Sequence, residues 1–177
     1  TDQDQLAADM ESAEDVSVEE LKRQVNLAEV VARPVWDLES KKASAIACVP
    51  VATANQTFIY GDALVASIPM GVVTLGHDRI GVHWAGRQGD GPPACVPVHF
   101  ESLATMRNRH LLFTSFLEMP PEARRKVLGE LLLPADIYSA AVEDVVRLFQ
   151  PFVGRIIVSC DLNWRHFGLL RALGIRV

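Results

Sequence analysis

Histidines are the side chains best suited to acid–base or metal chemistry in this 177-residue sequence. There are five of them: His77, His83, His99, His110 and His166. Their spacing includes no HExxH pair, the pattern that places two imidazoles on one helix face to hold zinc. His99 ends a predicted strand close to Glu101, and strand ends are where α/β proteins place ligand-binding groups. Because a lone histidine at such a position is more often structural, His99 is a candidate without an assigned partner.

Cysteine could supply a nucleophile, and Cys160 beside Asp161 is the best-placed example. Together with His99, this pair would form the site of an enzyme that uses a cysteine nucleophile. A cysteine on a buried strand more commonly serves packing. Cys48, Cys95 and Cys160 lie far apart without CxxC spacing, so neither a zinc site nor a disulfide framework is predicted. No serine lies in a GxSxG motif.

Alternating strand and helix patterns position these residues in the second half of the chain. Short apolar runs predict strands over 94–100, 127–133 and 155–162, and helical spacing predicts helices between them. A helix capped by Ser102 is expected to bury Leu103, Met106, Phe113 and Leu117. A helix over 139–150 is expected to bury Val142, Val145, Val146 and Phe149, and a last helix follows Asn163 and ends at Gly174. This alternation favours parallel strands with helical crossovers.

The first half is less regular. A capping box at 17–20 predicts a helix over 18–29. Strands are expected over 30–36 and 43–51, around a polar turn, and again over 57–60. Seven glycines interrupt residues 61–93, which are therefore predicted to form turns between short elements.

Composition and charge narrow the functional classes. Residues 1–20 carry eight acids and no base, so the formal net charge of −5 leaves about +3 for the remainder. We expect residues 1–16 to be an acidic flexible leader and residues 17–177 a single α/β domain. No apolar run is long enough to span a bilayer and no signal peptide is visible, which predicts a cytoplasmic protein. No basic–aromatic cluster indicates nucleic-acid binding.

Residues 32–51, ARPVWDLESKKASAIACVPV, resemble the opening hairpin of the EAL family, the bacterial cyclic-di-GMP phosphodiesterases. The family pattern runs roughly YQPIVDL, a short turn, and then the EAL triplet. Pro34–Leu38 fits the first part, and Ala47-Cys48-Val49 stands at the triplet. The resemblance extends over about 30–177, with a poorly matched stretch at 52–93. It is most similar to a divergent branch with VPVHFESLA-like and LRPF-like segments, here at 96–103 and 147–152.

The resemblance also locates the metal site of active members, in which carboxylates and an asparagine hold two divalent ions for phosphodiester hydrolysis. Four of its positions have lost their functional side chains: the triplet glutamate falls on Ala47, the phosphate-binding arginine on Val51, the strand asparagine on or near Pro97, and one aspartate of a DDFG-like segment on Cys160. Two carboxylates survive, Glu130 in an ELTE-like strand and Asp161. They are expected to be hydrogen-bonded or paired with an arginine such as Arg155, or to hold one Mg²⁺ or Mn²⁺ weakly.

These positions imply a catalytically inactive EAL-like domain that acts in signalling through protein–protein contact, without a cofactor. Two alternatives stay open: a receptor that binds cyclic-di-GMP without cleaving it, and a weak metal-dependent phosphodiesterase. The lost arginine at Val51 counts against the receptor.

The fold implied by the resemblance is a modified TIM barrel, and such barrels typically need about 200–250 residues or more. The barrel is therefore expected to be incomplete or shortened. An unclosed sheet exposes an edge, so we expect a homodimer, or contact with an upstream domain or another signalling protein.

Overall fold

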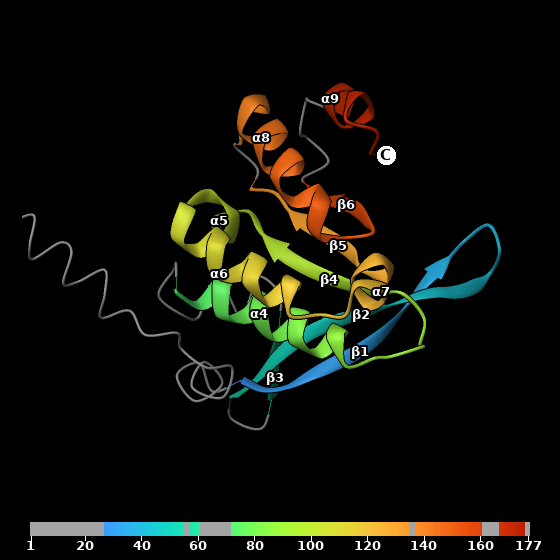
Figure 1. Ribbon diagram of the computed structural model, residues 1–177. Helices are drawn as coiled ribbons and strands as arrows, with labels where there is room; N and C mark the ends of the chain where they lie inside the picture. Colours follow the sequence, from blue (N-terminus) through green and yellow to red (C-terminus); the bar gives the residue numbers. More distant parts are fainter. Residues whose placement is uncertain (1–26, 55–56, 61–71, 135–136, 161–166, 176–177) are drawn as a thin grey trace, which may run out of the picture.

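The structure is a computed structural model that describes residues 27–54, 57–60, 72–134, 137–160 and 167–175. Within them, one six-stranded sheet has the order β1-β2-β4-β5-β6, with β3 pairing β2 off this path. Helices lie between the strands of the second half, so the predicted α/β class with mostly parallel strands and helical crossovers is confirmed (Figure 1). A closed barrel stays a prediction.

An antiparallel hairpin begins the described chain. Strands β1 (Leu27–Asp37) and β2 (Lys42–Ala54) pair in the register Arg33 to Ala47. The Asp37 carboxylate accepts a hydrogen bond from the Glu39 amide, an interaction typical of tight turns. Strand β3 (Thr57–Tyr60) adds to the distal end of β2. The predicted helix over 18–29 lies mostly outside the described residues, and its expected end is wrong because 27–29 belong to β1.

Three parallel strands follow: β4 (Ala94–His99), β5 (Leu128–Leu132) and β6 (Arg155–Ser159). Strand β4 pairs β2 in parallel through Ala47 and Cys95, and β5 and β6 continue in the same direction. The carboxyl ends of these strands therefore meet at one edge of the sheet, where α/β proteins place their sites.

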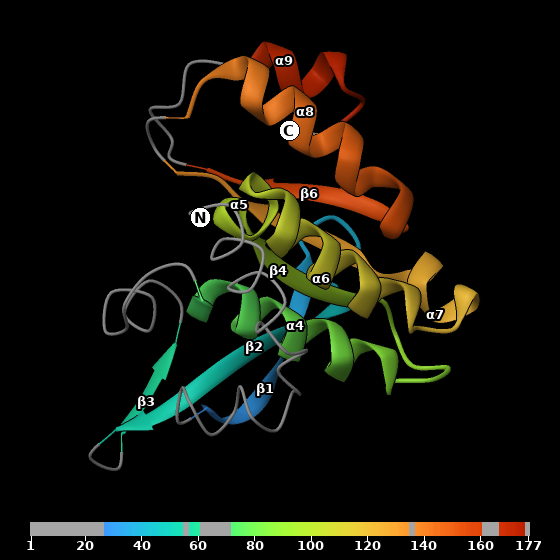
Figure 2. The ribbon, with the colours of Figure 1, turned by 60° about the vertical axis from the view of Figure 1, so that its left-hand side comes forward.

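Residues 61–93 were expected to form turns, and the structure corrects this prediction. Helix α4 (Val72–Gly86) occupies the middle of this stretch and packs on β4 and β2 (Figure 2). Its glycines suggested breaks, but Gly81 faces the sheet. A Cβ at Gly81 would already lie 3.4 Å from Val96 Cγ1, so glycine there lets helix and strand approach closely. Residues 61–71 lie outside the described part of the chain.

The helical segment after β4 is divided, contrary to the single helix expected from Ser102. Helix α5 (Phe100–Ala104) contains Ser102 in its interior, and α6 (Met106–Leu117) begins after Thr105. The Thr105 hydroxyl accepts a hydrogen bond from the Asn108 amide and is the true cap. Helix α7 (Pro121–Lys126) follows.

The buried face of α6 also differs from the prediction. Leu112 and Phe116 are fully buried, whereas Met106 and Leu117 are exposed. Leu103 is buried as predicted, and Phe113 is partly buried against the core. The restart of the helix at Thr105 shifts the helical phase, which turns Met106 and Leu117 outward.

The last elements agree better with the sequence. Helix α8 (Ser139–Phe149) buries Val142, Val145, Val146 and Phe149, as predicted. A short 3₁₀ turn, η1 (Gln150–Phe152), precedes β6, and α9 (Phe167–Ala172) ends the described chain. Strand β6 ends at Ser159, one residue before Cys160, and residues 161–162 of the predicted strand lie outside the described residues.

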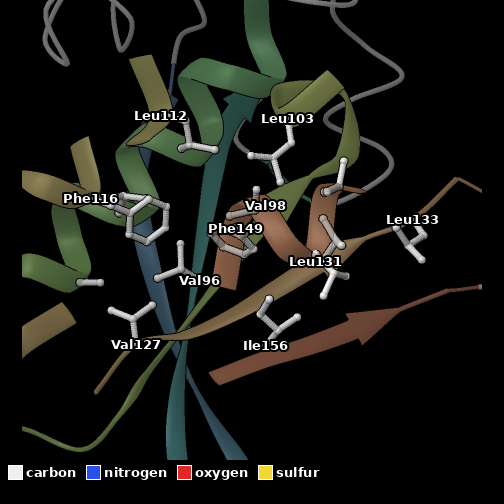
Figure 3. Close-up of a cluster of buried hydrophobic side chains, with 14 of the residues drawn as sticks. Val96, Val98, Leu103, Leu112, Phe116, Val127, Leu131, Leu133, Phe149 and Ile156 are labelled. Carbon is white, nitrogen blue, oxygen red and sulfur yellow. The ribbon is translucent and has the colours of Figure 1, made fainter. Parts of the chain in front are cut away.

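One hydrophobic core joins the helices to one face of the parallel strands (Figure 3). Val96, Leu131 and Ile156 supply its sheet side, and the rings of Phe116 and Phe149 meet edge to face at 5.6 Å. Residues of β5 alternate: Gly129 and Leu131 are buried toward this core, and Leu128, Glu130 and Leu132 lie on the opposite face.

Candidate functional site

Glu130 lies on the sheet face opposite the core, at the level where the resemblance places a metal site. Its Oε1 accepts a hydrogen bond of 2.7 Å from the Ser159 hydroxyl of β6. Its Oε2 lies 3.7 Å from the Cys95 thiol of β4, which donates to it. Side chains from both neighbouring strands therefore hold this half-buried carboxylate. Hydrogen bonding was one of the expectations for Glu130, and its partners here are Ser159 and Cys95.

The other described positions of the inferred metal site add no carboxylate beside Glu130. Pro97 of β4 is the register partner of Glu130. Ala47 of β2 pairs with Cys95, which precedes Pro97 by two residues on β4. Val51 lies four residues beyond Ala47, where β2 is buried and pairs with β3. Cys160 follows β6 half-buried against the core. Asp161 lies outside the described residues.

The thiols near this face are poorly suited to nucleophilic chemistry. Burial raises the pKa of Cys48 to about 12. Burial, reinforced by the neighbouring Glu130 carboxylate, raises the pKa of Cys95 to about 12. Since the thiolate is the reactive form, both groups are essentially unreactive at neutral pH and act as packing residues.

A second group of chemically capable side chains lies where helix α4 meets the end of β4. The Asp78 carboxylate accepts two hydrogen bonds from His99: one from its backbone amide at 2.9 Å, and one with ring Nδ1 at 2.6 Å. The His77 ring meets the His99 ring edge to face at 5.4 Å. Ligand atoms of His77, Asp78 and His99 all lie within 4.8 Å of one another, and all three residues are buried.

His77 has an unusual environment. It is 4% exposed, and neither ring nitrogen makes a hydrogen bond of acceptable geometry within the described residues. Burial lowers its pKa, an effect that neighbouring His99 strengthens and that Asp78 opposes. The carbonyl of Pro50 lies near enough to favour the protonated ring but does not reach hydrogen-bond geometry. The ring is therefore neutral and has unused nitrogen lone-pair capacity.

Sequence reasoning identified His99 at a strand end but missed its partner. The nearby Glu101 is exposed, and Asp78 contacts the ring instead. His77 and Asp78 were given no role because they lie six and five residues before His83 in a glycine-rich segment that was interpreted as turns. One signal was available: residues 70–91 contain no proline, which is compatible with a helix despite the glycines.

Comparison with known proteins places the fold. No protein-family model matches the sequence, and no curated protein matches it. The fold is similar to the crystal structure of an EAL domain protein from Listeria monocytogenes EGD-e, with a TM-score of 0.64 and 13% sequence identity. The match covers 90% of this chain and 64% of that chain, so the chain spans less than two thirds of that structure.

The described residues thus define an α/β domain with a largely parallel sheet flanked by helices. Its fold is EAL-like. In the part of the chain that the structure describes, no helix is both long and apolar enough to cross a membrane.

Proposed function

We propose that this chain is a catalytically inactive EAL-like domain that serves bacterial signalling through contact with another protein. The observation that carries the proposal is the environment of Glu130. Both of its carboxylate oxygens accept hydrogen bonds from neighbouring side chains. The positions beside it, Ala47 and Pro97, have no ligating atom in their side chains.

A two-metal phosphodiesterase needs several anionic oxygen ligands to hold its ions and to neutralise the phosphoryl oxygens. Among the described residues at this site, Glu130 is the one carboxylate on the strands. Each Glu130 oxygen keeps a lone pair beside its hydrogen bond from Ser159 or Cys95, but one carboxylate supplies too few anionic ligands for two ions. The described residues therefore do not fit a two-metal centre.

We expect no hydrolysis when the chain is incubated with cyclic-di-GMP and Mg²⁺ or Mn²⁺. Chromatography of the nucleotide would check for the linear product, with an active EAL enzyme as the positive control. Metal-dependent product that disappears in Glu130→Gln would contradict the proposal and establish a phosphodiesterase. Calorimetric titration of the same sample separates the alternatives: micromolar binding without hydrolysis would instead indicate a cyclic-di-GMP receptor.

The hairpin offers the surface that we propose for protein contact. It extends away from the helices (Figure 1). Near its tip, Trp36 is 60% exposed and Leu38 is 88% exposed. Large apolar side chains gathered at a projecting tip are typical of interaction sites, since tryptophan is enriched among residues that dominate binding energy. A second copy of this chain is the partner that we propose first.

Light scattering at micromolar concentration is expected to give twice the 19.5 kDa mass of the chain. The double variant Trp36→Ser with Leu38→Ser should be monomeric, because it removes the apolar contact area. Met106→Ser is the matched control: Met106 is also a strongly exposed apolar residue, but it lies on α6. A monomeric unmodified chain would refute the homodimer, and a dimer that survives the double variant would refute this surface.

A further inference from the structure

The cluster of His77, Asp78 and His99 is distinct from the Glu130 position and has no part in the function proposed above. Two of its members are neighbours in α4, and the third ends β4 (Figure 2). The three residues are 92% or more buried. Polar groups at this depth require partners, because burying one without a hydrogen bond costs free energy.

We propose that His77, Asp78 and His99 form a binding site for a divalent transition-metal ion of the zinc class. Two imidazoles and one carboxylate, with ligand atoms within 4.8 Å of one another, are the donor set of many protein sites for such ions. Imidazole nitrogen suits zinc, cobalt, nickel and copper, whereas magnesium prefers oxygen. The site therefore differs in chemistry from the carboxylate site of active EAL enzymes.

The second, independent observation is the unpartnered His77 ring. Both of its nitrogens are buried without a hydrogen bond among the described residues. An ion would give one of them a strong partner. The Thr74 hydroxyl is also buried and unpartnered, and Thr74 precedes His77 and Asp78 by three and four residues. This spacing places Thr74 on the same helix face, where zinc's remaining positions could take a hydroxyl or a water.

The geometry requires a small adjustment. Asp78 Oδ1 and His99 Nδ1 are 2.6 Å apart because they are hydrogen-bonded to each other. Two ligands bound at about 2.0–2.1 Å in a tetrahedral site lie about 3.3 Å apart. A separation increase of less than about 1 Å, within the reach of side-chain rotation, therefore admits an ion. The ion takes the place of the proton at Nδ1, and the neutral His99 ring then carries its proton on Nε2.

The site is built for structure, since the buried ligands leave little room for a substrate. An ion would tie α4 to the end of β4, where α5 begins. Because the ligands converge in the folded chain alone, metal binding would stabilise the fold.

The test uses the tag-free chain, freed of metal with a chelator and titrated with Co²⁺ and Zn²⁺. We expect one ion per chain, visible absorption bands of tetrahedral Co²⁺ that Zn²⁺ displaces, and a higher Tm with Zn²⁺ than with Mg²⁺. His77→Gln and His99→Gln should each weaken binding by at least about tenfold. His110→Gln, which alters an exposed histidine on α6, is the matched control and should bind as the unmodified chain does.

The proposal is overturned if the unmodified chain binds no ion, or if His77→Gln binds as tightly as the unmodified chain. It is also overturned if His110→Gln abolishes binding, which would indicate a surface site. Circular dichroism of each variant guards against misfolding. Should His77→Gln fail to fold, X-ray absorption of the unmodified chain decides: mixed nitrogen and oxygen ligation including two imidazoles supports the site, and ligation without imidazole rejects it.

Discussion

Replacing Asp78 with alanine is expected to lower the free energy of unfolding by about 2–5 kcal/mol, because two buried hydrogen bonds disappear together. The carboxylate is fully buried and bonds both the backbone amide and ring Nδ1 of His99. A buried donor that loses its acceptor costs about 1–3 kcal/mol. The backbone amide of His99 would lose its partner where water has little access.

Urea denaturation followed by circular dichroism, with a chelator present, would measure the effect without any contribution from metal. Asp78→Asn should fall between the unmodified chain and Asp78→Ala, since its carbonyl oxygen can still accept from the His99 amide. Asp90→Ala is the matched control: Asp90 is exposed and makes one surface ion pair with Lys126 at 3.6 Å. Such pairs contribute about 0–1 kcal/mol. Equal losses for Asp78→Ala and Asp90→Ala would contradict the structural role of Asp78.

Such a loss of stability would show that Asp78 attaches helix α4 to the end of β4. Asp78 and His99 are 21 residues apart in the sequence, and the Asp78 carboxylate links the two elements by its hydrogen bonds to His99. Arg79, the next residue, reaches the other way and donates from Nε to the Ser115 hydroxyl of α6 at 2.9 Å. Two adjacent polar residues of α4 thus contact the end of a strand and a neighbouring helix. Buried polar bonds of this kind fix the orientation of α4 more sharply than packing alone.

Local patterns were enough to predict the elements that have them. Strands β4 and β5 are short apolar runs, one following Pro93 and the other ending just before Pro134, and α8 has a single apolar stripe. The existence of these elements and the buried face of α8 therefore follow from the sequence. Helix α4 has no such stripe, because polar residues are buried in it beside the apolar ones, among them Thr74, His77 and Asp78. Two of its glycines lie at tertiary contacts: Gly81 faces Val96 of β4, and Gly86 faces Met119. Tertiary packing thus decides a helix that local propensity argues against.

The candidate sites likewise combine features that the sequence predicts with contacts that only the fold shows. The sequence indicated that His99 ends a strand, and the EAL resemblance placed Glu130 on the sheet. The partners of both residues are distant in sequence: Asp78 is 21 residues from His99, and Ser159 is 29 residues from Glu130. These contacts depend on strand order and on the docking of α4, which the sequence does not express as a period or a motif. Single candidate residues could therefore be chosen from the sequence, but the partners that they contact could be identified only from the fold.

Gly154→Ala is expected to lower the free energy of unfolding by about 3 kcal/mol or more, at the upper end of overpacking effects. A Cβ on Gly154 would lie 1.9 Å from the Arg125 carbonyl oxygen and 2.7 Å from its carbon. Both are backbone atoms, so rotation of a side chain cannot relieve the clash. The Gly154 amide also donates to the Val127 carbonyl at 2.9 Å, which fixes this close crossing before β5 and β6 start.

The same substitution at Gly168 separates the clash from the general effect of adding a methyl group. Gly168 lies in α9, and an added Cβ there would meet nothing within 4 Å. Alanine is favoured over glycine inside a helix by about 0.5–1 kcal/mol, so Gly168→Ala should be neutral or slightly stabilising in the same urea titration. If Gly154→Ala were as stable as Gly168→Ala, the crossing would have to be looser than the structure places it. The contact at Gly154 would then not hold the start of β6 in place. The register of β6 against β5, which brings the Ser159 hydroxyl to Glu130, would depend on other contacts.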